Sequence, residues 1–547
     1  MPSGRTAAGL IALALGIASA CSATGQRLEH ELDSIGVAAV KAHVAWLADD
    51  AREGRLAGEP GYDAAAAYVA GRFAEFGLEP GGADGWLQPV PLARYWLVPG
   101  SPQVIVHRSD GDEALEYREH YGMAADKVRE SNRVRAEVVY VGYGVHAPEF
   151  GYSDYDGIDV DGRIVALFGG APSTFPHAER AFYASSRTKA TEAVRRGAVG
   201  TIRLRSKRVQ AQTPWKRYRE LTGKRPGMAW LSDSGEASGY FPELEGAITI
   251  SAAAAERLFA GTPLSFAGAL EATAADTPAS APLGLELTLA RRSRQERFSS
   301  PNVIGMVRGT DRQLADEFVV YTAHLDGTGR DPAPETDDDI ENGMYDNAMG
   351  IAIMLETARV FAAEPPARSV LFIALTAEES GLLGSDYFVH HPTVAADAIV
   401  ANVNLDMPLF LYPVADLVAF GSEHSSLEAL VADAAAREGF GLTPNPLPEE
   451  SLFIRSDQYS FVKKGVPAIY LMPGFTSRDP AIDGEAVFRE HLKEHYHEPG
   501  DDLSRPVDWD SVLRFTRAHI RIGYGIANSD ARPAWNDGDF FGEHFAR

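Results

Sequence analysis

The chain has little with which to form covalent crosslinks. Its 547 residues include a single cysteine, Cys21, so no disulfide bond can form within the chain. Disulfides stabilise many exported domains, and their absence means that stability must come from packed cores and bound metal. With 45% hydrophobic and 23% charged residues, the composition is that of a globular protein large enough for two or three domains.

Basic residues are also in short supply. The chain has 51 Lys and Arg against 76 Asp and Glu, which gives a formal net charge of -25 at pH 7. Binding to nucleic acid depends on cations that neutralise phosphates, and anionic membrane surfaces attract basic segments. The charge balance therefore argues against nucleic acid and against an anionic membrane surface as partners.

Long apolar runs are missing, apart from a short one near the N-terminus. After Arg5, the run Ala7–Ala20 is too short for a permanent membrane span, and Cys21 follows it directly. This segment resembles a bacterial lipoprotein signal, in which cleavage precedes the cysteine and the sulfur receives a lipid. An ordinary secretory signal is the alternative. We expect residues 1–20 to be a signal peptide and the mature protein to be exported to the periplasmic side of the envelope, with membrane contact only through lipid on Cys21.

What the sequence does contain is a series of metal-binding side chains beyond apolar runs. Three runs that read as buried strands are each followed by such side chains: Phe318–Ala323 by His324, Val370–Leu375 by Glu378 and Glu379, and Ile399–Leu405 by Asp406. In open α/β sheets, ligands bind beyond the carboxyl ends of the strands. We therefore expect these side chains to meet at one edge of a sheet.

Two further candidates lie outside these runs. Asp346 stands in the small-residue stretch Asn342–Gly350, where glycine lets the backbone approach a metal closely. His497 stands in a segment with two other histidines, His491 and His495. Spacing alone does not choose among these three histidines.

The combined set suits a pair of metals. Five candidate ligands occur in order along the chain: His324, Asp346, Glu379, Asp406 and His497. Histidine and carboxylate are ligands that catalytic zinc prefers, and five are too many for one zinc ion that keeps an open position. They suit two metals that share a carboxylate. Asp326 follows His324 by two residues, and its carboxylate can accept the other ring N–H of that histidine.

Each of these side chains also has a simpler explanation. Glu378 and Glu379 could begin a solvated helix, since acids are favoured in a first turn, and Asp406 could cap a loop. The acidic run Asp337–Glu341 lacks the alternating oxygen ligands and the glycine of a calcium loop, so we expect a solvated loop there. The enzyme interpretation depends on the conjunction of the motifs.

The motifs resemble those of a known family, the co-catalytic di-zinc aminopeptidases. Relatives in that family include the bacterial leucyl aminopeptidases, glutamate carboxypeptidase and the transferrin receptor. The matching stretches follow the family order: Ala323–Asp326, Asn342–Gly350, Glu378–Ser385, Asn404–Met407 and Tyr496–Pro499. They lie in a region from about Asn302 to Asn528.

The resemblance implies a role for each residue. The implied metal sets are Asp346 as the bridge, His324 with Asp406 on one zinc ion, and Glu379 with His497 on the other. The implied catalytic and substrate residues are Glu378 as general base, Tyr496 as oxyanion stabiliser, and Arg455 as a contact to the substrate main chain. One departure from the family pattern is Asn347, where many relatives carry a second aspartate.

The resemblance also implies an α/β fold. The family has a three-layer αβα zinc-peptidase domain with a mixed, largely parallel central sheet, and many members carry an inserted β-rich protease-associated domain. Short strands around Gly- and Asp-rich turns mark that insert here. The predicted boundaries are 28–133 for the N-terminal part of the catalytic domain, 134–289 for the protease-associated domain, 290–530 for the catalytic domain and 531–547 for a tail without a recognisable pattern.

The predicted function is that of a zinc-dependent exopeptidase acting on peptides, with an aminopeptidase favoured. Carboxypeptidases in the family hold the substrate carboxylate with arginine clusters. Here basic residues are sparse between Asp406 and Pro467, and acids dominate near the candidate ligands, which suits a substrate ammonium group better. The alternatives are a carboxypeptidase or dipeptidase of the same family, a one-zinc glutaminyl cyclase, and a catalytically dead, receptor-like binding protein. The complete second ligand set argues against the last two.

Overall fold

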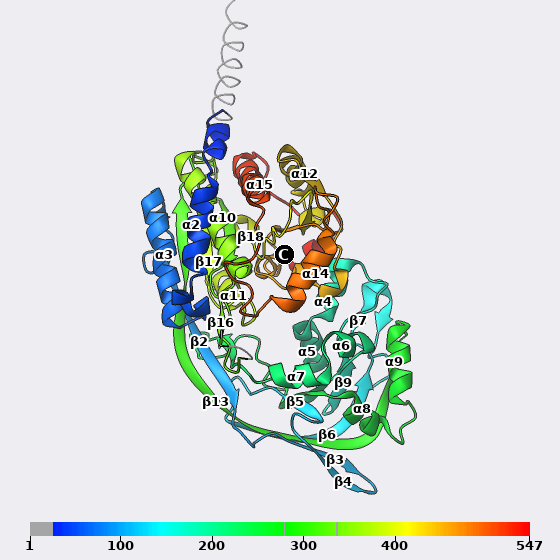
Figure 1. Ribbon diagram of the computed structural model, residues 1–547. Helices are drawn as coiled ribbons and strands as arrows, with labels where there is room; N and C mark the ends of the chain where they lie inside the picture. Colours follow the sequence, from blue (N-terminus) through cyan, green and yellow to red (C-terminus); the bar gives the residue numbers. More distant parts are fainter. Residues whose placement is uncertain (1–25, 278, 335–336, 547) are drawn as a thin grey trace, which may run out of the picture.

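Two lobes make up the protein in the computed structural model, which describes residues 26–277, 279–334 and 337–546 (Figure 1). The predicted signal peptide and Cys21 lie outside these residues. The larger lobe is built from both ends of the described chain and the smaller lobe from its middle.

The larger lobe is organised around a sheet with a parallel centre. The central strands pair in parallel in the order β17 (Ser369–Leu375), β14 (Phe318–His324), β18 (Ile399–Leu405) and β21 (Ala468–Pro473). Antiparallel strands flank this centre, with β13 (Ser280–Val307) beside β17 and β19 (Asp416–Phe420) beside β21. All residues of the four central strands are buried, as their near-continuous apolar runs predict. The predicted mixed, largely parallel sheet is confirmed.

Helices cover both faces of this sheet. Helix α10 (Met349–Ala363) packs against α2 (Val37–Leu47), α3 (Pro60–Phe76) and α15 (Trp509–Asn528). Helix α11 (Leu383–His390) packs against α13 (Gln458–Val462), which contacts β18 and β21.

Two neighbouring residues of β14 show that these helices lie on opposite faces. The Tyr321 hydroxyl donates a hydrogen bond to the His519 carbonyl in α15. The Thr322 hydroxyl donates to the Asn404 side chain, whose amide donates to Gln458 at the start of α13. Since successive strand side chains point to opposite faces, the predicted three-layer αβα arrangement is confirmed.

The smaller lobe has a sheet of its own. Its parallel strands pair in the order β6 (Ser131–Val141), β9 (Ile164–Phe168), β10 (Gly200–Leu204) and β12 (Gly246–Ile250). The hairpin of β3 (Gln103–Arg108) and β4 (Gly111–Leu115) joins through β13, and β5 (Tyr121–Met123) pairs with β12. Its helices are α4 (His177–Ala184), α5 (Ser186–Arg195), α6 (Lys207–Gln212), α7 (Trp215–Leu221), α8 (Ala252–Phe259) and α9 (Phe266–Ala274).

This lobe begins earlier than the predicted boundary at residue 134. Its sheet includes β3, which starts at Gln103. The β3–β4 hairpin buries only Val104, Val106 and Leu115, and its other residues are half-buried or exposed. The apolar signal of this hairpin is therefore too weak to mark the start of a domain. The identification of the lobe as a protease-associated domain stays a prediction.

Strand β13 belongs to both lobes. Its first half pairs with β6 and β3 in the smaller sheet, and its second half pairs with β2 (Leu87–Leu97) and then β17 in the larger sheet. Figure 1 shows it as a long curved ribbon that passes from one lobe into the other.

The C-terminal tail also contacts both lobes. Helix α16 (Phe540–Phe545) buries Phe541 completely, with its ring 5.0 Å from the ring of Phe453 in the larger lobe. The neighbouring ring of Phe540 lies 5.4 Å from that of Phe182 in α4. No helix in the described ranges is long and apolar enough to cross a membrane.

Candidate metal centre

The carboxyl ends of three parallel strands deliver the first candidate ligands. His324 is the last residue of β14 and lies opposite Leu375 of β17 in register. Glu378 and Glu379 follow β17, and Asp406 follows β18. The register of the parallel strands thus brings these side chains to one edge of the sheet, as the sequence predicts.

Asp346 lies at the centre of the cluster, in the turn η3 (Met344–Ala348) that precedes α10. Its Oδ1 is 3.1 Å from Nε2 of His324, and its Oδ2 is 3.2 Å from Nε2 of His497. The two oxygens of one carboxylate therefore face two different histidines.

The remaining two predicted ligands complete a pair on each side of Asp346. Oδ1 of Asp406 lies 3.2 Å from Nε2 of His324, and Oε2 of Glu379 lies 2.8 Å from Nε2 of His497. His324, Asp346 and Glu379 each offer a ligand atom within 4.8 Å of the others. All five predicted ligands thus come together in two groups that share Asp346.

The choice among three histidines is settled by contacts. His497 touches Asp346 and Glu379, as just described. His491 is fully buried beside the ring of Tyr345, with 5.6 Å between ring centroids, and His495 lies 3.1 Å from a carboxylate oxygen of Glu490. Neither belongs to the cluster.

Asp326 supports the cluster in a different way from the predicted one. Nδ1 of His324 lies 3.1 Å from the backbone carbonyl oxygen of Asp326 and 3.9 Å from its carboxylate. The carboxylate instead accepts the backbone N–H groups of Glu378, at 3.0 Å, and Glu379, at 3.3 Å. The backbone carbonyl of Asp326 therefore orients His324. The carboxylate of Asp326 instead binds the amides of the loop that carries Glu378 and Glu379.

Asp501 is a buried carboxylate whose importance was not apparent in the sequence. It accepts the backbone N–H groups of Tyr345 and Asp346, each at 3.1 Å. Burial raises the pKa of Asp501 to about 7, and the nearby charge of Asp346 acts in the same direction. Asp501 lies in the loop after His497, far from Asp346 in sequence, so no local pattern reveals that the two residues are neighbours.

Asn347 stands where the family pattern has a second aspartate, and both the nitrogen and the oxygen of its side-chain amide are hydrogen-bonded. Its amide N–H donates to the Leu405 carbonyl at 2.9 Å, and its Oδ1 accepts from the Gly350 N–H at 3.1 Å. The amide thus ties the Asp346 turn to the end of β18. A carboxylate has no N–H with which to make the first of these bonds.

The charges of the cluster shift its pKa values strongly. Burial raises the pKa of Glu378 well above its usual range, and the carboxylates of Asp406 and Asp457 add to the rise. Burial works to lower the pKa of His324, but the surrounding carboxylates outweigh it and raise that pKa well above its usual range. Burial also raises the pKa of Asp457, which is completely buried, to about 7.

The other two predicted site residues lie at the rim. The ring of Tyr496 stacks on that of His497, with 3.8 Å between centroids. Burial and the charges of Asp346 and Glu379 raise the pKa of Tyr496 well above its usual range, while Arg455 opposes the rise. The Arg455 side chain is 48% exposed and donates to the Glu450 carbonyl at 3.3 Å, so it is near the site but directed partly to solvent.

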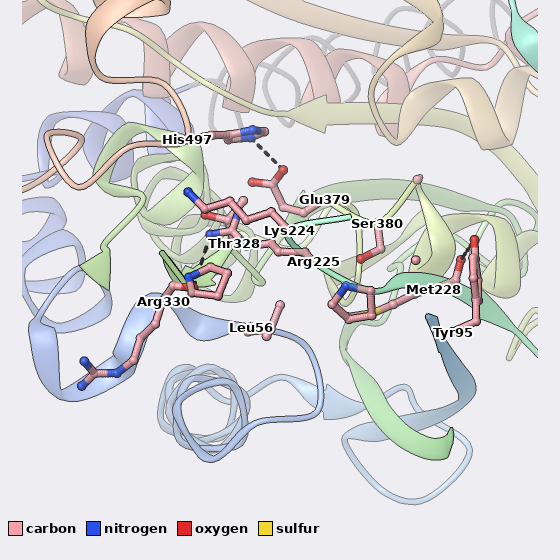
Figure 2. Close-up of a pocket in the computed structure, with 14 residues that line it drawn as sticks. Leu56, Tyr95, Lys224, Arg225, Met228, Thr328, Arg330, Glu379, Ser380 and His497 are labelled. Carbon is pink, nitrogen blue, oxygen red and sulfur yellow. Dashed lines mark hydrogen bonds and ion pairs between the residues drawn. The ribbon is translucent and has the colours of Figure 1, made fainter. Parts of the chain in front are cut away.

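A cavity of about 520 Å³ opens beside Glu379 and His497. Its lining includes Leu56, Thr328 and Arg330 together with Lys224, Arg225 and Met228, which follow α7 in the chain (Figure 2).

The cations that line this cavity all have acidic partners. Lys224 pairs with Asp331, Arg225 with Glu341 at 2.5 Å, and Arg330 with Asp339 at 2.7 Å. Arg217 of α7 pairs with Glu498, next to His497, at 2.6 Å. The smaller lobe is therefore joined by ion pairs to the loops that surround the candidate ligands.

Comparison with known proteins finds a family that is similar in sequence over the region of this cluster. Residues 302–522 match the sequence profile of peptidase family M28. An aminopeptidase of Bacillus subtilis (strain 168), YwaD, is 36% identical over 110 residues, which is 20% of this chain and 22% of that protein. A probable zinc metalloprotease of Pyricularia oryzae is 35% identical over 255 residues, which is 42% of this chain and 50% of that protein. The alignments thus span half or less of these relatives.

A solved structure extends the likeness to nearly the whole fold. The aminopeptidase from Aneurinibacillus sp. strain AM-1 superimposes with a TM-score of 0.53, at 18% sequence identity, over 92% of this chain and 97% of that chain. At that identity the likeness concerns the fold alone. All five candidate ligands lie within residues 302–522, the region whose sequence is similar to peptidase family M28.

Proposed function

We propose that this protein is a zinc-dependent aminopeptidase that removes residues from the free amino ends of peptides. The observation that carries the proposal is the pair of contacts made by Asp346, whose two oxygens face His324 and His497 at 3.1 and 3.2 Å. Each histidine also has a carboxylate partner of its own, Asp406 or Glu379.

The side chains fit two zinc ions. Imidazole nitrogens and carboxylate oxygens are zinc ligands, and a carboxylate with one oxygen directed to each side suits a bridge. His324 and Asp406 would hold one ion, Glu379 and His497 the other, and Asp346 both. When bound, the zinc pair supplies Lewis acidity, which acidifies a water and polarises the scissile carbonyl.

The chain's own residues supply the proton transfers. Glu378 takes a proton from the attacking water and gives it to the leaving amine. For that task the Glu378 carboxylate must be ionised before water attacks, and bound zinc ions would favour the ionised form by offsetting the neighbouring carboxylates that raise its pKa. Tyr496 keeps its proton, since its pKa is also raised, and donates a hydrogen bond to the oxyanion.

The charges around the cavity support a substrate with a free amino end. Lys224, Arg225 and Arg330 are each engaged by an acid, which leaves them poorly placed to bind a substrate carboxylate. The carboxylates of the cluster favour an ammonium group instead.

A set of three matched peptides tests this proposal. One is unblocked, one is N-acetylated and one has a C-terminal amide, and all share one sequence. We expect N-acetylation to abolish cleavage and amidation to leave the rate within about twofold. Loss of cleavage on amidation alone would identify a carboxypeptidase, the second candidate function. Cyclisation of an N-terminal glutamine without release of a residue would identify a glutaminyl cyclase.

We also propose that the protein is exported and carries lipid on Cys21, because this single cysteine follows a short apolar run directly. A Cys21→Ser variant should lose membrane association and acyl labelling. Unchanged processing and unchanged membrane association would contradict the lipid assignment.

A further inference from the structure

Arg55 is a buried cation whose hydrogen bonds all end on the backbone. It closes the turn η1 (Asp50–Arg55) and is 1% exposed. Its guanidinium donates to four carbonyl oxygens: Leu325 at 3.0 Å, Leu47 at 2.8 Å, Asn342 at 2.7 Å and Gly343 at 3.0 Å. Arginine has five N–H donors in a rigid fork, so four of them are committed to fixed points of the chain.

Three of those four carbonyls belong to the loops that carry metal ligands. Leu325 directly follows His324, and Asn342 and Gly343 lead into the turn of Asp346. These two loops are far from Arg55 in sequence and come from different elements. One guanidinium therefore sets the separation between the backbone at His324 and the backbone before Asp346.

The rest of the turn is fitted closely against the same loops. The Asn342 amide donates to the Ala48 carbonyl at 3.0 Å and to Oδ1 of Asp50 at 2.9 Å. A Cβ at Gly54 would lie 2.4 Å from the Gly329 carbonyl oxygen. The turn and the ligand loops thus form one packed unit with little room to shift.

The charge of Arg55 also bears on the site. It has no ion-pair partner among the described residues, although a buried charge without a partner is costly. The carboxylates of Asp326, Asp346, Asp501 and Glu379 are nonetheless close enough to act on it electrostatically. Its positive charge offsets the repulsion among those carboxylates, and four peptide dipoles solvate it.

We propose that Arg55 is a positioning residue of the metal centre, which fixes the loops of His324 and Asp346 relative to each other and balances the carboxylates without touching the substrate. The proposal rests on the proposed zinc-peptidase function. It predicts that replacing Arg55 changes zinc affinity and turnover in addition to stability.

The test compares Arg55→Lys and Arg55→Met with Arg368→Lys. Arg368 is as buried as Arg55, donates to the Ile526 and Ser529 carbonyls, and precedes β17 at the end of the sheet away from the cluster. Zinc affinity is measured by competition with a chromogenic chelator, turnover with an aminoacyl amide, and thermal stability on the metal-free protein.

We expect Arg55→Lys to lower zinc affinity by roughly 10-fold or more, as for other residues that orient ligands, and to lower kcat with KM within about twofold. Arg368→Lys should lower the melting temperature but leave zinc affinity and kcat unchanged. Equal zinc affinity in wild type and Arg55→Lys, with only a lower melting temperature, would overturn the proposal.

Asn342→Ala provides a second test in case the Arg55 variants do not fold. It releases the same loop from Ala48 and Asp50 while the guanidinium remains, so zinc affinity should fall in the same direction but by less. A folded Asn342→Ala protein with unchanged zinc affinity would count against the proposal that these contacts position the ligand loops. If the wild-type protein binds two zinc ions but cleaves no peptide, the proposed function fails, whereas the affinity comparison still decides the role of Arg55.

Discussion

At the scale of single residues, the neighbours Glu378 and Glu379 differ in their contacts. Oε2 of Glu379 lies 2.8 Å from His497, within the ligand cluster, whereas Glu378 appears in no such ligand contact among the described residues. Both are carried by a loop whose amides bind the Asp326 carboxylate. The two adjacent side chains thus leave one turn in different directions, and we propose different roles for them.

We expect Glu378→Gln to keep the fold and the metals but to lose turnover by about a hundredfold to ten-thousandfold, because an amide cannot accept the proton of water. Glu379→Gln should instead bind less zinc. Steady-state kinetics and elemental analysis of the two variants measure this contrast. Wild-type turnover of the Glu378→Gln protein would show that Glu378 is not the general base.

His519 provides a pH-dependent prediction far from the reaction. It is completely buried in α15, and burial lowers its pKa from 6.5 to about 4. Between about pH 6.5 and pH 4, this histidine binds a proton in the unfolded chain but not in the folded protein. The free energy of unfolding therefore falls by about 1.4 kcal/mol for each pH unit over this range as the pH is lowered.

His519→Leu should remove that slope, so that wild type loses about 2 kcal/mol more than the variant between pH 7 and pH 5. Urea unfolding at both pH values measures it, with exposed His30→Gln as the control. Parallel pH dependence in wild type and His519→Leu would show that the histidine is protonated in the folded state.

At the scale of elements, strand ends were predictable and the contacts that support them were not. His324, Glu379 and Asp406 were found because each lies at or shortly after the end of an apolar run, and parallel strands end at a common edge. Arg55 and Asp501 were missed as supporting residues, since their partners lie far along the chain and leave no local pattern. The partner of His324 is the carbonyl of Asp326 and not its carboxylate. The sequence could not predict this, because it gives the side chains but not the direction of the backbone.

The turn before Asp346 depends on a glycine. Gly343 has φ of +58°, and a Cβ there would lie 2.2 Å from the Asp346 carbonyl oxygen. Gly343→Ala should destabilise the protein by more than the ~1–2 kcal/mol of left-handed backbone strain alone, and should weaken zinc binding. Gly85 has a similar φ of +62° with no atom near its Cβ position, so Gly85→Ala is the matched control. Equal effects of the two substitutions on chemical unfolding would contradict the steric argument.

At the scale of the whole molecule, the two lobes are held together by contacts of different kinds. Ion pairs join α7 and the segment after it to the loops around the candidate ligands. The aromatic tail joins α4 to the larger lobe. The change in strand pattern predicted a separate block in the middle of the chain, but not that its sheet includes β3 from Gln103. The role of the tail was not, because its aromatic partners Phe182 and Phe453 lie far from it in sequence.

Phe541 should be the most important residue of the tail, since its ring is fully buried. Phe541→Ala should cost about 3–5 kcal/mol of local stability and expose α4 to hydrogen exchange. Phe545, which is only half-buried, is the control, and Phe545→Ala should cost less. Exchange mass spectrometry that detects no change in α4 with Phe541→Ala would mean that the tail does not hold the two lobes together.

Strand β13 gives the molecule a mechanical character. One continuous backbone of 28 residues is hydrogen-bonded into both sheets, so no free linker lies between them along this path. Rotation of the smaller lobe against the larger one has to twist or bend this shared ribbon, and its resistance is elastic, like that of a torsion bar. We expect small-amplitude rocking that springs back to one orientation, in contrast to the wide swings of lobes connected by a hinge.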